Sequence, residues 1–115
     1  MPEPAAFLNG FGFRKGTTMG GFTLVDANAT HETVTRYREY LYHINLSFAN
    51  NGNGNISNLI TAIKSMISGD HIIKSGYGNP YKCVIEPPNV SSGQCEGANN
   101  KMHCTVRLIG HSYRV

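Results

Sequence analysis

VTRYREYLYHINLSFANNGNGNISNLITAIKSMI, residues 34–67, is the stretch that decides the fold of this chain. In its first part, Val34–Phe48, apolar side chains recur at spacings of three and four residues. Residues at these spacings lie on one face of a helix. The pattern therefore predicts an amphipathic helix that packs against another layer through Val34, Tyr37, Leu41, Ile44 and Phe48.

The second part, Ile56–Ile67, predicts another helix with a wider apolar face. Asn55 or Ser57 is placed to accept a hydrogen bond from the first free amides of this helix, and Gly69 is placed to end it in the left-handed conformation. Between the two patterns, Asn50–Gly54 is a turn of Asn and Gly, which adopt positive φ at low cost. Because so short a connection favours antiparallel neighbours, we expect a helical hairpin.

The flanking segments predict strands. The expected strands are a pair within Asn9–Asp26 that turns near Lys15-Gly16, then His71–Lys74, Tyr81–Glu86 and Met102–Ile109, with a polar loop at Asn89–Asn100 between the last two. Helices followed by a run of strands indicate an α+β protein. We expect a single α+β domain, residues 1–115, with two layers: an antiparallel sheet of four to five strands and the helical hairpin packed on one face.

Composition narrows the function only broadly. With 40% hydrophobic and 15% charged residues among 115, the chain is typical of a globular protein and not of a disordered one. The net charge of +3 comes from scattered Lys and Arg without a dense basic run, so an anionic partner is only slightly favoured. No export signal or apolar stretch long enough for a membrane span is visible, so we expect a cytoplasmic protein that does not enter a membrane.

The three cysteines are expected to be reduced, because their number is odd and no export signal is visible. Alternation puts Cys83 and Cys104 on the inward faces of the last two strands, and antiparallel pairing could set them opposite each other. The roles of Cys83, Cys95 and Cys104 stay open. No close pair of Cys or His ligands occurs, so neither a metal nor a cofactor is expected.

The outward face of the last two strands carries the best candidates for chemistry. Glu86, His103 and Arg107 are the carboxylate, imidazole and guanidinium that a metal-independent endoribonuclease needs for a base, an acid and a phosphate clamp. With Cys83 opposite Cys104, Glu86 and His103 would lie diagonally at ~7–8 Å. Lys82 and Thr105 would bind ligand beside them. A solvated sheet face also carries mixed charges for no catalytic reason, and that interpretation is the more common one.

The order of the expected elements resembles that of ribosome-dependent messenger-RNA interferases of the RelE type: an early strand, two antiparallel helices and three antiparallel strands. In that family, basic and aromatic residues lie on the sheet and near the C-terminus. The resemblance implies a binding role for His111, Tyr113 and Arg114 in this chain.

Gly10-Phe11-Gly12-Phe13 is similar to the base-stacking strand of RNA-recognition motifs and to an early strand of cold-shock domains. Nine upstream residues cannot supply the strand, helix and strand that precede it in the first family, and predicted helices stand where the second continues with strands. We therefore favour aromatics packed at the rim of the core beside flexible glycines. The alternative is a nucleic-acid-binding accessory protein that uses Phe11, Phe13, Arg14 and Lys15.

Tyr40 and Tyr42 lie off the apolar stripe of the first predicted helix, where tyrosines favour an interface, so we expect a homo-oligomer such as a dimer. The equally supported alternative is that strands or the N-terminal segment cover this side of the helix. Taken together, the sequence favours a small binding or interaction module with a pocket between the sheet and the loops rich in Gly and Asn. A small-molecule or anionic ligand fits this hypothesis, and the endoribonuclease is the alternative. Whether the protein is an enzyme stays open.

Overall fold

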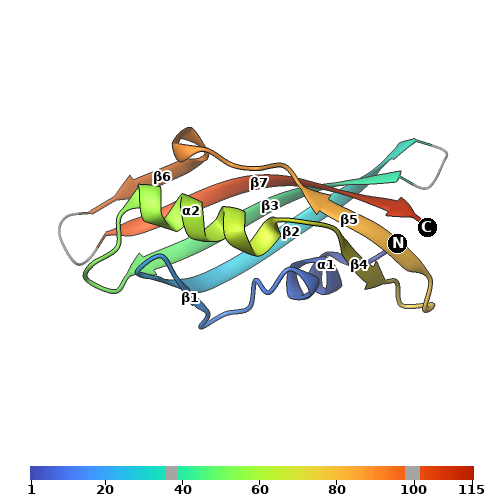
Figure 1. The fold of residues 1–115 in the computed structure, drawn as a ribbon, viewed down its shortest axis with the longest axis horizontal. Coiled ribbons are helices and arrows are strands. Elements are labelled where there is room, and N and C mark those ends of the chain that lie inside the picture. Colours follow the sequence, from blue (N-terminus) through green and yellow to red (C-terminus); the bar gives the residue numbers. More distant parts are fainter. Residues whose placement is uncertain (36–38, 98–101) are drawn as a thin grey trace.

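The fold is built on one strongly curled antiparallel sheet (Figure 1), seen in a computed structural model that describes residues 1–35, 39–97 and 102–115. Six of its seven strands run in the order β1-β2-β3-β7-β5-β4, and the seventh, β6, pairs with part of β7. The described elements are α1 (Pro4–Gly10), β1 (Thr18–Met19), β2 (Phe22–Thr35), β3 (Glu39–Asn50), α2 (Ile56–Ile67), β4 (His71–Lys74), β5 (Pro80–Ile85), the 3-10 turn η1 (Val90–Ser92), β6 (Gly93–Glu96) and β7 (His103–Arg114).

The first predicted helix is wrong, because this part of the chain forms β2 and β3. Along β3, inward and outward side chains alternate with a period of two, and the buried ones are Tyr42, Ile44, Leu46 and Phe48. The same residues also satisfy part of a helical spacing, and pairing with β2 and β7 decides between the two patterns. Tyr37, a member of the proposed stripe, lies outside the described residues.

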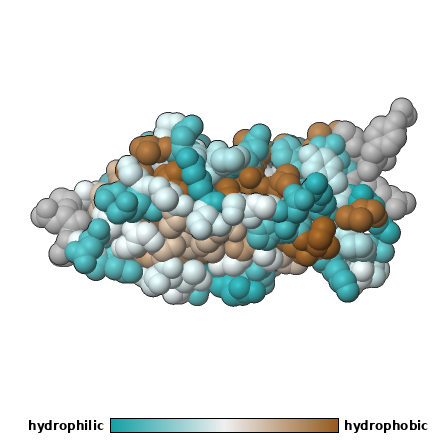
Figure 2. Space-filling view, viewed as in Figure 1, coloured by the Kyte–Doolittle hydropathy of each residue, from teal (hydrophilic) through white to brown (hydrophobic). Residues whose placement is uncertain are grey.

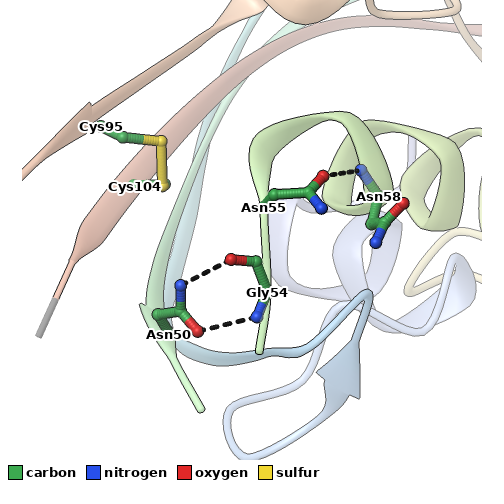
Figure 3. The surroundings of a disulfide bond; sticks show 6 residues. All are labelled: Asn50, Gly54, Asn55, Asn58, Cys95 and Cys104. Atoms are coloured by element: carbon green, nitrogen blue, oxygen red, sulfur yellow. Dashed lines mark hydrogen bonds between the residues drawn. A yellow bond between two sulfur atoms is a disulfide. The ribbon is translucent and has the colours of Figure 1, made fainter. Parts of the chain in front are cut away.

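The second predicted helix is confirmed as α2. Its bounds are Ile56–Ile67, and the Asn55 side chain accepts a hydrogen bond of 2.9 Å from the backbone N–H of Asn58 (Figure 3). Gly69 follows the helix with a φ of +79°, the left-handed conformation that glycine favours. The turn at Asn50–Gly54 therefore joins a strand to a helix, and the helical hairpin does not exist. The structure therefore lacks the element order on which the RelE-type resemblance depended.

The N-terminal segment also departs from the expectation. Pro4 to Gly10 form the short helix α1, which was not predicted. The first strand of the expected pair is only Thr18–Met19, and the pair β1–β2 turns at Gly20 and Gly21, not near Lys15-Gly16. Both turn glycines have positive φ, and a Cβ on Gly21 would lie 2.6 Å from the Cα of Gly54. This close approach explains why the turn needs glycine there.

The later strands are confirmed, but their register is not the predicted one. β4 has the expected bounds, and β5 and β7 bury the residues whose alternation pointed inward. Cys83 lies opposite Ser112, not Cys104, because β7 continues to Arg114 and β5 pairs with its far end. The polar segment at Asn89 onward holds η1 and the strand β6, and β6 takes the pairing position that the prediction gave to β5.

The hydrophobic core fills the concave side of the sheet, where α2 lies across one half and α1 near the middle (Figure 1). Phe7 of α1 stacks on the Tyr42 ring at 3.9 Å between centroids, and the Tyr42 hydroxyl donates a hydrogen bond of 2.6 Å to the carbonyl of Pro2. Figure 2, viewed from the helix side, shows hydrophobic residues only in separate patches among hydrophilic ones.

The predicted α+β class is confirmed by these helices and strands, whereas the predicted sheet of four to five strands under a helical hairpin is wrong.

None of the helices in the described ranges is both long and apolar enough to cross a membrane.

Candidate functional site

Both helices cover the concave side, so the opposite side of the sheet is open. We call it the outer face. It is made by the outward side chains of the long strands, because successive residues of a strand point to opposite sides. Its members are Asn28, Thr30 and Glu32 on β2, His43, Asn45 and Ser47 on β3, Gln94 and Glu96 on β6, and His103, Thr105, Arg107 and Ile109 on β7.

Arg107 lies where β7 has a strand on one side only. On that side Arg107 faces Asn45 of β3. On the other side β6 pairs with β7 as far as Val106, and β5 begins to pair at Gly110. The chain between these two pairings passes through η1, which therefore forms a wall beside Arg107.

Two shallow hollows meet at Arg107. One, of about 370 Å³, is bounded by η1 and β6 and is lined by Ser91, Ser92, Gly93, Gln94, Thr105 and Arg107. The other, of about 350 Å³, lies over β3 and is lined by His43, Ile44, Asn45, Arg107, Leu108 and Ile109. Arg107 lines both, so its guanidinium can reach a ligand in either of them.

Neutral hydrogen-bonding groups surround Arg107 in these hollows. Among the described residues no carboxylate lies within ion-pair distance of its side chain, which is exposed. The carboxylate of Glu32, on β2, lies 3.5 Å from the ring of His43. An exposed guanidinium beside hydroxyl and amide groups is suited to bind a carboxylate, phosphate or sulfate group.

A third hollow, of about 290 Å³, extends the site along β6 and is lined by Gln94, Cys95, Glu96, His103 and Thr105. Glu96 lies directly opposite His103 in the register. The hollow thus offers an acid and an imidazole on neighbouring strands, next to the group around Arg107.

A disulfide between Cys95 and Cys104 joins β6 to β7 at the third hollow (Figure 3). The expectation that all three cysteines are reduced is therefore wrong for this pair. The two cysteines are a register pair with a Cα–Cα distance of 4.0 Å, so pairing of the two strands brings the thiols together. Cys83 stays free and buried, and burial raises the pKa of its thiol to about 12.

The proposed catalytic residues are not brought together as a triad. The Glu86 N–H donates to the carbonyl of Ile109, whereas His103 is six residues farther along β7, about 20 Å away in an extended strand. The diagonal contact of Glu86 with His103 is therefore wrong. His103 and Arg107 do share the outer face, with Thr105 between them.

The other proposed binding residues gather at the far end of β7. The Nζ atom of Lys82 lies 3.5 Å from the carboxylate Oδ2 of Asp70. The ring Nδ1 of His111 lies 3.9 Å from the carboxylate Oε1 of Glu39. Tyr113 is opposite Glu39 in the register, and burial together with that carboxylate raises the pKa of its hydroxyl.

Arg114 points to the inner side, with its guanidinium 5.8 Å from the centre of the Tyr81 ring. Tyr40 packs against the same ring, at 6.2 Å between centroids. None of these residues lines the hollows at Arg107. Thr105 alone among the proposed binding residues does.

Several aromatic residues weighed for surface roles are buried. Tyr42 is fully buried, so it cannot contact a partner protein as predicted. Phe11 and Phe13 are 3% and 2% exposed, which removes them as base-stacking platforms and confirms that they belong to the core. The physical reason is α1, which turns this segment toward the concave side.

Sequence reasoning missed Asn45, Gln94 and Glu96. Asn45 was hidden by the incorrect helix, although the alternation of its neighbours in β3 could have revealed it. Gln94 and Glu96 lie in a segment without periodicity, and only the disulfide and the register place them beside β7.

Within the ranges that the structure describes, no group of three or more His, Cys, Asp or Glu residues is placed to hold a metal ion. The chemistry on offer is therefore that of an exposed guanidinium, hydroxyls, amides and an acid–imidazole pair. The function has to be argued from this geometry, because no family model, no curated protein and no solved structure matches the chain.

Proposed function

We propose that this protein binds a small polar ligand that carries an anionic group, and that Arg107 on the outer face holds that group. The observation that carries the proposal is that Arg107 lines two adjoining hollows and has no carboxylate partner among the described residues. Its guanidinium offers five N–H donors in a planar fork that matches carboxylate and phosphate groups.

The shape of the site supports an extended ligand over a compact one. Both hollows are shallow, and the one beside η1 is mainly polar, unlike the deep apolar pockets that enclose drug-sized molecules. Hydroxyls and amides from η1, β6 and β3 lie on both sides of Arg107 and suit a ligand with several hydrogen-bonding groups. Because the site is exposed to solvent, we expect salt to weaken binding.

The test is titration of the protein with inorganic phosphate and with a sulfated disaccharide, followed by NMR. We expect the amide shifts of β7, β3 and η1 to move, and Arg107→Gln to weaken binding at least about tenfold, which corresponds to about 1.4 kcal/mol. Arg14→Gln is the matched control, since Arg14 is exposed and lies outside the site. Equal affinities of Arg107→Gln and the wild type would overturn the proposal.

The endoribonuclease is a weaker second candidate. One observation favours it: Glu96 lies opposite His103, so Glu96 rather than Glu86 would be the carboxylate partner. Incubation with RNA tests it, with His103→Ala as the comparison. If wild type and variant leave the RNA equally intact, this candidate is removed.

The disulfide also bears on location. Disulfides persist mainly in oxidising compartments, so Cys95–Cys104 favours a place outside the reducing cytoplasm over the cytoplasmic location expected from the sequence.

A further inference from the structure

One edge of the sheet is open along most of β2. On the side away from this edge, β2 pairs with β3 over the whole length of β2. At the open side, β1 covers only Phe22 and Thr23, and Leu24 exchanges hydrogen bonds with Gly16 and Thr17. From there to Thr33, no backbone hydrogen bond reaches this edge from any residue in the described ranges.

The open segment lacks the sequence devices that usually protect sheet edges, and α1 packs against β2 without a backbone hydrogen bond to it. Exposed edges are normally kept short, interrupted by proline, lysine or a bulge, or covered by a helix. β4, at the opposite edge, is four residues long and ends in Lys74. The segment 27–33, Ala-Asn-Ala-Thr-His-Glu-Thr, contains no proline and no basic residue except His31, and the irregularities of β2 lie at its two ends, near Val25 and Val34.

The backbone groups that face this edge follow from Leu24. Its N–H and C=O both point to the edge, and its side chain points inward. In a strand, residues whose side chains share one face direct their backbone groups to the same edge. The inward residues Ala27, Ala29, His31 and Thr33 therefore offer their N–H and C=O groups to a new neighbour.

We propose that two copies of this chain pair through this edge, antiparallel, about a two-fold axis at Thr30. In this register Thr30 faces Thr30 of the other copy, Asn28 faces Glu32, and no charge faces a like charge. About eight backbone hydrogen bonds form, because Ala27 pairs with Thr33 and Ala29 with His31 in both directions.

The side chains select this register over its neighbours. With the axis at Ala29, Asp26 of one copy would face Glu32 of the other, and like charges directly opposite are destabilising. With the axis at His31, fewer hydrogen bonds form. The axis at Thr30 also brings Val34 of one copy near Val25 of the other, and these side chains are 49% and 46% exposed in the single chain.

The partner is a second copy because the edge is complementary to itself, as a two-fold interface requires. A contact through one strand segment is smaller than the ~1,200–2,000 Å² of stable complexes, so we expect a dimer that dissociates on dilution. The pairing leaves Arg107 free and does not depend on the proposed ligand.

The test is sedimentation velocity over a dilution series with a charge swap at the axis. Wild type should shift from monomer to dimer as concentration rises. Thr30→Lys and Thr30→Glu should each stay monomeric, since each sets two like charges face to face, and their equimolar mixture should dimerise again. Thr61→Lys is the control, because it adds the same charge to the exposed side of α2 and should dimerise as the wild type does.

Hydrogen exchange provides a second readout at single amides. The amides of Ala29 and His31 should become protected as the wild-type concentration rises, and those of Thr30→Lys should not. A wild type that sediments as a monomer at millimolar concentration overturns the proposal. So does a Thr30→Lys variant that dimerises like the wild type. Arg107→Gln should dimerise normally, which separates this proposal from ligand binding.

Discussion

Replacing Tyr42 by Phe tests how the N-terminal segment is held to the sheet. The Tyr42 hydroxyl donates to the carbonyl of Pro2 at 2.6 Å and accepts from the hydroxyl of Ser112 at 3.2 Å, in a buried position. Tyr42→Phe keeps the stacking on Phe7 and leaves these two polar groups without a partner. At about 1 kcal/mol for each group, we expect the free energy of unfolding to fall by about 2 kcal/mol near pH 8.

The same substitution should matter less at high pH. Burial raises the pKa of Tyr42 from 10.0 to about 12, against the lowering effect of the bond from Ser112. The folded state thus favours the neutral phenol. The contribution of the neutral phenol to the free energy of unfolding is complete below pH 10 and is lost as the pH rises toward 12. At pH 11, ionisation of Tyr42 in the unfolded state lowers the free energy of unfolding of the wild type by about 1.4 kcal/mol, and Tyr42→Phe has no such loss. The difference in the free energy of unfolding between the two proteins should therefore shrink to below about 1 kcal/mol.

The assay is urea unfolding followed by circular dichroism at pH 8 and pH 11. Tyr77→Phe is the control, since Tyr77 is 94% exposed and should show no difference from wild type at pH 8. Adding Ser112→Ala to Tyr42→Phe should recover part of the loss, because it removes one of the unpaired groups. A difference between wild type and Tyr42→Phe that is equally large at both pH values would refute the reasoning.

Two further predictions concern the turn and the disulfide. Gly21→Ala should lower the free energy of unfolding by more than about 2 kcal/mol, since its φ is +84° and its Cβ would meet the backbone of Gly54, whereas Gly76→Ala, with open space around it, should be nearly neutral in the same urea titration. Reduction of Cys95–Cys104 should cost about 2–3 kcal/mol, as expected for a short closed loop, and unfolding curves with and without reductant that superimpose would contradict this.

Local sequence patterns were sufficient to predict a helix or strand where they allowed only one interpretation. α2 is a twelve-residue helix with one apolar face, a capping Asn55 and a terminating Gly69, all close to one another along the chain. β7 has strict alternation, so its inward face was also predictable. The segment 34–48 contains a helical spacing and, from Tyr40 to Phe48, a strand alternation as well, and pairing of β3 with β2 and β7 decides between them.

What the sequence by itself determined is the set of elements whose signals are local: α2, the alternating strands β5 and β7, and the α+β class. Tertiary structure alone decided that β3 is a strand between β2 and β7, that Cys95 meets Cys104, and that Arg107 lies in an open stretch of sheet beside η1. The physical reason is that register and pairing depend on contacts between residues far apart in the chain, and their energies appear only when the sheet forms.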